Sequence, residues 1–229
     1  MLDKPVSSTA DEAYRVLRAA IVDQRLPAGC RLTETALAQL MSCSRRHIEQ
    51  ALLRLAEHGL VTLRRNAGAC VATPSYIEGR EIYEVRRLLE VPVVQKVCAA
   101  HRQDGMRRLR ANLDAEARAH RAADPRAAVR LSGEFHVLLA ELSGSAELQE
   151  QVERLVARTS LVTQLYANAE GLGCWHHQHG DLLAAIARRD EERASRLMRD
   201  HLLELEGALR VRSPRTRHHE LERALQSSP

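Results

Sequence analysis

The sequence predicts a mostly α-helical protein in two parts: a small N-terminal unit with two short strands, then an antiparallel bundle of six helices. Alanine, leucine, arginine and glutamate dominate its 229 residues, and they favour helices. Between Leu37 and Val61, apolar residues recur at helical spacing on both sides of a short polar break. From Tyr76 onward the chain has long helical stretches and no strand signal, which predicts the bundle.

Charge and composition restrict the class of partner. A net charge of +4 permits binding to nucleic acid, whereas an aromatic content of 3% argues against a stacking platform for single strands. The five cysteines are widely spaced and odd in number, which predicts reduced thiols in a cytoplasmic protein. No apolar run reaches the ~18 residues of a membrane span and no signal peptide is visible, so we expect no membrane partner.

The N-terminal unit begins with a helix expected over Thr9–Gln24. A turn at Leu26–Gly29 and a short extended piece at Arg31–Leu32 follow it. Thr33 is expected to cap a second helix, which carries Leu40 on its apolar face.

The third helix carries a basic cluster at its start. Ser44 occupies the N-cap position, where its hydroxyl can accept a hydrogen bond from a backbone N–H of the first turn. Arg45, Arg46 and His47 follow in that turn, and a helix-turn-helix presents such donors to the major groove of DNA. The alternative is a small helical domain with a solvated charged face that never contacts DNA.

Two β-prone segments follow, at 60–63 and 69–72, and a basic turn containing Arg65, Asn66 and Gly68 joins them. Such a pair forms the wing of a winged helix-turn-helix. We therefore assign residues 1–75 to a DNA-binding domain, 76–213 to an all-helical domain and 214–229 to a basic tail. The six bundle helices are expected over residues 76–102, 104–122, 124–142, 146–167, 175–188 and 190–211.

The order and spacing of the first motifs resemble the N-terminal domain of GntR-type transcription regulators. The resemblance rests on PAGCRLTETALAQL, SRRHIEQALLRLAEHGLV and NAGACVATPS. It implies that Arg45 contacts a base or a phosphate and that Gly68 lies at the wing tip near the minor groove. The other residues that we expect at the DNA are Thr33, Ser44, Arg46, His47, Glu49, Arg65 and Asn66.

Two positions of the third helix depart from the family pattern. His47 replaces the usual proline, and Glu49 stands where the family usually has arginine, four residues after Arg45. A carboxylate there would repel phosphate, but it could accept from a cytosine amino group or pair with Arg45. We therefore expect an operator sequence that differs from the common family sites.

The bundle resembles the FCD-type effector domain of the FadR branch of that family. The matching segments are IYEVRRLLEVPVVQKVCAA, GEFHVLLAELSGS and HGDLLAAIARRDEERASRLMRDHL. This resemblance implies a homodimer whose bundle binds a small carboxylic acid or another metabolite, often beside a divalent metal. It also implies a ligand-responsive regulator of a double-stranded DNA operator, and repression relieved by ligand is the commoner arrangement.

The family's metal site uses one aspartate and three histidines, and the histidines correspond here to His136, His179 and His201. Ser132 occupies the aspartate position, so one anionic ligand is lost and we expect weaker binding. Three imidazoles with an open position suit zinc, and nickel is also acceptable. Glu134 lies two residues before His136 and points away on a helix. The alternative is that the histidines line a cavity in a metal-free regulator.

A carboxylate effector needs a cationic partner, and Arg86 in the first bundle helix is the candidate, with Ser132 beside the ligand. An ion pair between Arg86 and Glu90 is the alternative. A metal-dependent hydrolase would need a general base beside the histidines, but the chain has no HExxH pattern and Glu134 is misdirected. The sequence therefore predicts a regulator and not an enzyme.

Overall fold

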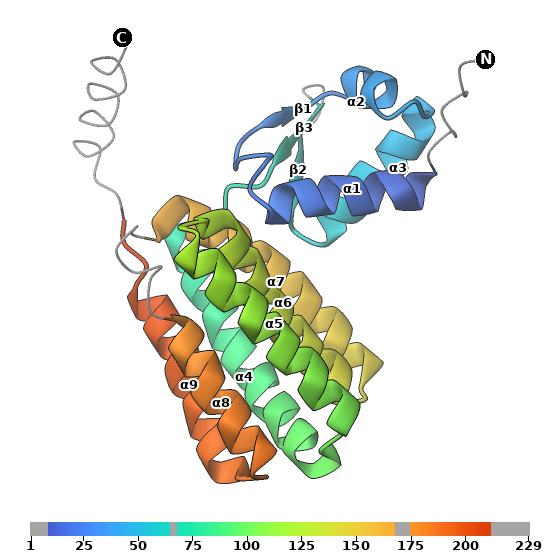
Figure 1. The fold of residues 1–229 in the computed structure, drawn as a ribbon. Helices are drawn as coiled ribbons and strands as arrows, with labels where there is room; N and C mark the ends of the chain where they lie inside the picture. Colours follow the sequence, from blue (N-terminus) through green and yellow to red (C-terminus); the bar gives the residue numbers. More distant parts are fainter. Residues whose placement is uncertain (1–8, 65–67, 168–174, 212–229) are drawn as a thin grey trace.

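The computed structural model describes residues 9–64, 68–167 and 175–211. In this part of the chain the protein is mostly helical, and a small winged head sits at one end of a long helical bundle (Figure 1). The predicted fold class is therefore confirmed. The expected basic tail and the wing residues Arg65 and Asn66 lie outside the described residues.

The head combines three helices with a three-stranded antiparallel sheet. The helices are α1 (Ala10–Val22), α2 (Glu34–Leu40) and α3 (Arg45–Glu57). The strands are β1 (Arg31–Leu32), β2 (Val61–Arg64) and β3 (Gly68–Val71), in the order β1-β3-β2. The extended piece at Arg31–Leu32 therefore completes the sheet by pairing with β3.

Side-chain caps begin two of the three head helices. Thr9 accepts from the backbone N–H of Glu12. Ser44 accepts from that of His47, as predicted. Thr33 stands at the N-cap of α2, as predicted, although its side chain makes no cap hydrogen bond. The expectation for Leu40 is wrong, because this residue is 81% exposed. With seven residues and no buried side chain, α2 adds little to the head's core.

The bundle contains the six predicted helices, and short connections reverse the chain between most of them. They are α4 (Tyr76–Ala100), α5 (Gln103–Arg121), α6 (Pro125–Leu142), α7 (Ala146–Tyr166), α8 (Trp175–Ala187) and α9 (Glu191–Gly207). Asp124, Ser145 and Asp190 cap α6, α7 and α9. None of the described helices is long and apolar enough to cross a membrane.

The linker between head and bundle, Thr73–Ser75, is held at several points. Ser75 forms a capping box with Glu78 at the start of α4. The hydroxyl of Tyr166 on α7 donates to the carbonyl oxygen of Pro74 at 2.9 Å. The linker is therefore tied to the start of α4 and to the end of α7.

Helix α7 also packs directly against the head. Ala157 and Leu161 belong to the head's hydrophobic core rather than to that of the bundle. The backbone N–H of Ala28 donates to the side chain of Gln164 at 2.7 Å. Packing and hydrogen bonds thus define how the head sits on the bundle, with α1 across α7 (Figure 1).

Candidate functional site

Helix α3 presents the residues that we expect at the DNA. Its rear face is buried in the head through Ile48, Ala51, Leu52 and Leu55. This packing leaves Arg45, Arg46 and Glu49 exposed, with His47 partly exposed beside them. Gly68 is exposed at the start of β3 with φ +80°, a conformation that favours glycine. The structure therefore places these side chains and the wing on the outside of the head.

The ion pair of Arg45 is made with α2. Its guanidinium lies 3.3 Å from the carboxylate of Glu34, so of the two roles considered for Glu49 the described structure does not contain the pairing with Arg45. The two side chains of the observed pair are 68% and 38% exposed, and such pairs contribute little stability. A DNA phosphate can therefore replace Glu34 at small cost. Glu49 is left exposed in a position that can face bases.

A second group of contacts ties α3 to α1. A hydrogen bond of 2.8 Å joins the Tyr14 hydroxyl to Nδ1 of His58, the residue that ends α3. Burial and the nearby cation Arg154 lower the pKa of His58, which favours the neutral ring that this bond needs. The guanidinium of Arg54 lies 4.0 Å from the centre of the Tyr14 ring. These contacts add to the packing that joins α1 to α3.

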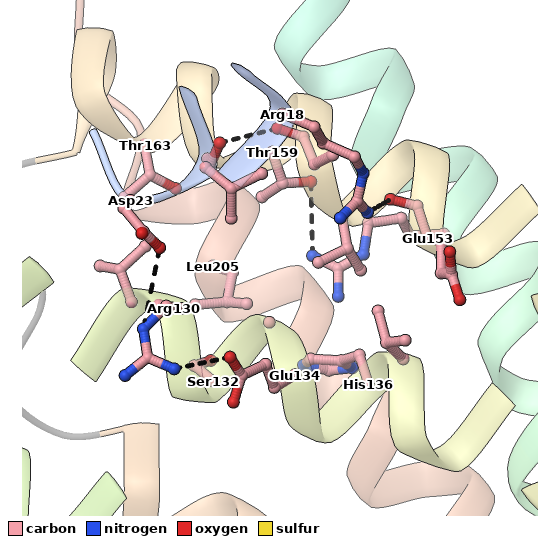
Figure 2. Close-up of a pocket in the computed structure, with 18 of the residues that line it drawn as sticks. Arg18, Asp23, Arg130, Ser132, Glu134, His136, Glu153, Thr159, Thr163 and Leu205 are labelled. Atoms are coloured by element: carbon pink, nitrogen blue, oxygen red, sulfur yellow. Dashed lines mark hydrogen bonds and ion pairs between the residues drawn. The ribbon is translucent and has the colours of Figure 1, made fainter. Parts of the chain in front are cut away.

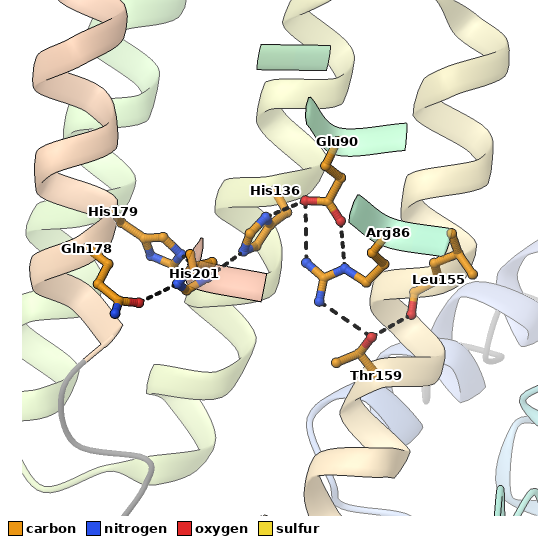
Figure 3. A network of polar contacts seen from close by, with 8 residues as sticks. All are labelled: Arg86, Glu90, His136, Leu155, Thr159, Gln178, His179 and His201. Atoms are coloured by element: carbon orange, nitrogen blue, oxygen red, sulfur yellow. Dashed lines mark hydrogen bonds and ion pairs between the residues drawn. The ribbon is translucent and has the colours of Figure 1, made fainter. Parts of the chain in front are cut away.

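The three predicted histidines meet inside the bundle. His136 comes from α6, His179 from α8 and His201 from α9, and all three are buried. Nε2 of His201 lies 3.1 Å from Nε2 of His179 and 3.3 Å from that of His136. Figure 3 shows the three rings directed toward one another. Histidines as far apart in the sequence as His136 and His201, which are separated by 65 positions, therefore form one cluster.

The other nitrogen of each ring faces an oxygen acceptor. Nδ1 of His136 lies 2.5 Å from the Glu90 carboxylate, and Nδ1 of His179 lies 3.0 Å from that of Glu116. Nδ1 of His201 lies 2.6 Å from the side-chain oxygen of Gln178 (Figure 3). An oxygen acceptor opposite each Nδ1 favours the tautomer with the proton on that nitrogen. Three Nε2 lone pairs then converge on one point.

This geometry fits a bound cation. A tetrahedral zinc ion with Zn–N bonds of about 2.0–2.1 Å separates its ligand atoms by roughly 3.3 Å, close to the observed spacings. Burial lowers the pKa of His136 to about 4 and that of His201 well below its ordinary value. Both rings are therefore neutral at physiological pH, which is the form that binds metals. The three histidines thus have the geometry to hold a metal ion.

The carboxylates behind the rings were not predicted from the sequence. Glu90 and Glu116 are both buried, and Oε1 of Glu116 has no hydrogen-bond partner in the described part of the chain. Carboxylates in this position orient metal-binding imidazoles and raise their basicity. Ser132 lines the same cavity as His136, and Glu134 pairs with Arg130 at 2.6 Å. The histidines therefore have outer carboxylate partners although the family's aspartate is missing.

Arg86 forms the ion pair that we considered as the alternative to ligand binding. Its guanidinium donates to both oxygens of Glu90, at 2.6 and 3.4 Å, and both side chains are buried. Burial raises the pKa of Glu90, but Arg86 and His136 outweigh it and hold this pKa at about 2. Arg86 also reaches Oγ1 of Thr159 at 3.5 Å (Figure 3). The pair therefore joins α4 and α7 to the histidine centre.

A cavity of about 530 Å³ lies between the head and the bundle. Figure 2 shows Arg18 and Asp23 of α1 on one side and Ser132 and His136 of α6 on the opposite side. Arg86 and Thr159 add polar groups from α4 and α7. Of the three histidines, His136 lines this space. The space thus reaches from one edge of the histidine centre to a helix of the head, and both residues that we expected at a ligand line it.

Comparisons with known proteins support the same two domains. The model for bacterial regulatory proteins of the gntR family matches residues 9–71, and that for the FCD domain matches residues 81–204. The chain is 25% identical over 207 residues to the HTH-type transcriptional repressor RspR of Escherichia coli K12, covering 90% of this chain and 91% of that protein. It is 28% identical over 212 residues to the HTH-type transcriptional repressor GlaR of the same strain, covering 85% of this chain and 93% of that protein.

Two solved structures share the fold. Escherichia coli McbR/YncC superimposes with a TM-score of 0.78 at 20% identity, covering 87% of this chain and 95% of that one. A GntR regulator from Rhodococcus sp. RHA1 superimposes with a TM-score of 0.75 at 24% identity, covering 88% of this chain and 99% of that one. The exposed recognition helix, the wing and the domain order agree with both family matches. The chain therefore belongs to the GntR family of transcription regulators, with an FCD domain behind its DNA-binding head, and it is not an enzyme.

Proposed function

We propose that this regulator is a homodimeric repressor whose operator affinity is controlled by a small carboxylate held in the cavity, beside a divalent metal. The observation that carries the proposal is the composition of the cavity wall. Arg18 and Asp23 of the head face the same space as His136 and Arg86 of the bundle. A ligand in that space contacts both domains, so it can bind one arrangement of them better than another.

His136, His179 and His201 would hold the metal, as zinc or nickel. A bound dication would supply an open coordination position for an oxygen of the effector. The buried charges of Arg86 and Glu90 cancel, so a dication would leave the centre positively charged. A carboxylate would offset that charge, which supports an acidic effector.

Repression and dimerisation rest on different observations. RspR and GlaR are both named repressors. Exposed apolar side chains gather on α4 and α9, which pack against each other: Ile77, Val85, Leu88 and Leu203. A second copy of the chain would cover them and would pair two recognition helices on a pseudo-palindromic operator in the cytoplasm.

A gel-shift assay with the DNA that flanks the protein's own gene tests the proposal. We expect retardation at low salt and a loss of retardation when the effector is added with zinc. The absence of retardation at low salt would count against DNA binding, because phosphate contacts are strongest under that condition.

A metal-free regulator with the same cavity is the second candidate, and the loss of the family's aspartate at Ser132 favours it. The variant Ser132→Asp separates the two. If the centre binds metal, the added carboxylate should raise zinc affinity at least about tenfold, the scale on which even outer partners of a metal site act. Competition with a chelating dye measures this affinity. The control is Ser132→Asn, because asparagine has the size of aspartate but no charge. An equal gain in zinc affinity in that variant would contradict the prediction.

The variant Glu49→Arg tests whether this position reads bases. We expect a changed operator preference, worth about 1–3 kcal/mol at the affected base pair, because arginine pairs with guanine where glutamate accepts from cytosine. Selection from a random DNA library measures the preference. Glu57→Arg is the matched control, since it makes the same charge change at the far end of α3. An unchanged preference in Glu49→Arg would mean that this side chain does not face the bases.

A further inference from the structure

Three guanidinium groups line the cavity, and they differ in their partners. Arg86 is paired with Glu90. Arg130 is paired with Glu134 at 2.6 Å and with Asp23 at 3.7 Å. Arg18 has no carboxylate within ion-pair distance among the residues that the structure describes. The cavity therefore contains one cation that the protein does not neutralise.

The contacts of Arg18 leave most of its donors to the cavity. It donates to the backbone oxygen of Glu153 at 3.4 Å, and its charge and a hydrogen bond also act on Tyr14. The Glu153 carboxylate instead accepts from Gln149 at 2.9 Å. A guanidinium has five N–H donors in a fixed fork that matches a carboxylate. Arg18 is thus suited to bind an acid that enters the space.

We propose that Arg18 binds a carboxylate of the effector and that the effector is a small dicarboxylate. One carboxylate would lie at the histidine centre and the other at Arg18, so that the ligand bridges the bundle and the head. This inference rests on the proposed function and specifies the ligand class. Both ends of the cavity would carry positive charge: the metal-loaded histidine centre, which the cavity reaches at His136, and the unpaired guanidinium of Arg18.

The position of Arg18 also explains how such a ligand acts on DNA binding. Arg18 lies one helical turn after Tyr14 on α1, and Tyr14 is hydrogen-bonded to His58 at the end of α3. A carboxylate held by Arg18 therefore pulls on the helix that supports the recognition helix. The ligand stabilises the arrangement in which α1 is drawn to the bundle, and the operator-bound population falls if DNA requires another arrangement.

Matched acids test the inference by calorimetry on the full, zinc-loaded chain. The probes are succinate, glutarate and adipate, each compared with the monocarboxylate of the same length: butyrate, pentanoate and hexanoate. We expect at least one diacid to bind at least about tenfold more tightly than its monoacid. Arg18→Gln should remove this advantage, and Arg18→Lys should retain part of it. Arg15→Gln, on an exposed position of the same helix, should leave it unchanged.

Two results would overturn the inference: no diacid exceeds its monoacid, or Arg18→Gln keeps the advantage. Arg18→Gln should also keep the far-ultraviolet circular dichroism and the zinc content of the unaltered protein. If it does not, Arg18 is a structural residue of the head and the assignment is wrong. Failure of the unaltered protein to bind DNA would refute the repressor alone, because the diacid preference is measured without DNA.

Discussion

His179→Ala is expected to reduce the zinc content of the purified protein from about one ion per chain to nearly none. Loss of an outer partner of a metal site costs about 10–100-fold in affinity, and loss of one of three direct ligands should cost more. Nε2 of His179 faces Nε2 of His201 at 3.1 Å, so no other side chain can take its place without moving the cluster. Elemental analysis after exhaustive dialysis measures the metal content.

His177→Ala is the matched control for this experiment, because His177 lies on the same helix with its side chain exposed. His179 stacks on Phe135 with ring centres 4.4 Å apart, so alanine could also loosen the core. His179→Gln keeps more of the volume and separates the two effects. Equal zinc content in the unaltered protein and both His179 variants would remove the proposed metal site.

Arg86→Met is expected to lower the free energy of unfolding by about 3–5 kcal/mol. The substitution leaves the Glu90 carboxylate buried without its main cationic partner. Removing one partner of a buried ion pair typically costs about 3–5 kcal/mol of stability. Domains have a total stability of about 5–15 kcal/mol, so the variant should lose a large part of it. Urea denaturation of the metal-free protein measures the change.

The double variant Arg86→Met, Glu90→Gln should recover part of the loss, since it removes both buried charges. Arg108→Met breaks a pair with Glu141 whose side chains are 50% and 41% exposed, and it should cost no more than about 1 kcal/mol. If Arg86→Met lowers the free energy of unfolding by as little as Arg108→Met does, another group must neutralise Glu90.

Local patterns predicted most of the helices because their signals lie within a few residues. Ser44 and Asp124 mark helix starts through bonds to backbone groups three residues away, and the structure contains both bonds. The expected cap bond of Thr33 is missing, and Leu40 is exposed, because neither is decided by sequence spacing alone. Which face of a short helix is buried depends on packing with distant parts of the chain.

The site was predictable only where a family pattern marks the residues. The three histidines were found in this way, but Glu116 was not, since it lies 63 residues from His179 and carries no local signal. A glutamate on an amphipathic helix is ordinarily exposed, and only the bundle brings this one to the imidazole. Arg18 was missed for the same reason: its significance comes from a cavity that two domains form together.

The short linker at Thr73–Ser75 has a consequence for the operator itself. Two of its three residues are held, Ser75 by its capping box and Pro74 by the bond from Tyr166. In a dimer, two heads attached in this way can reach only a narrow range of half-site spacings. An operator lengthened by about five base pairs, half a turn of the double helix, would present its second half-site on the wrong side of the DNA. A flexible tether could compensate for that rotation, whereas this linker could not.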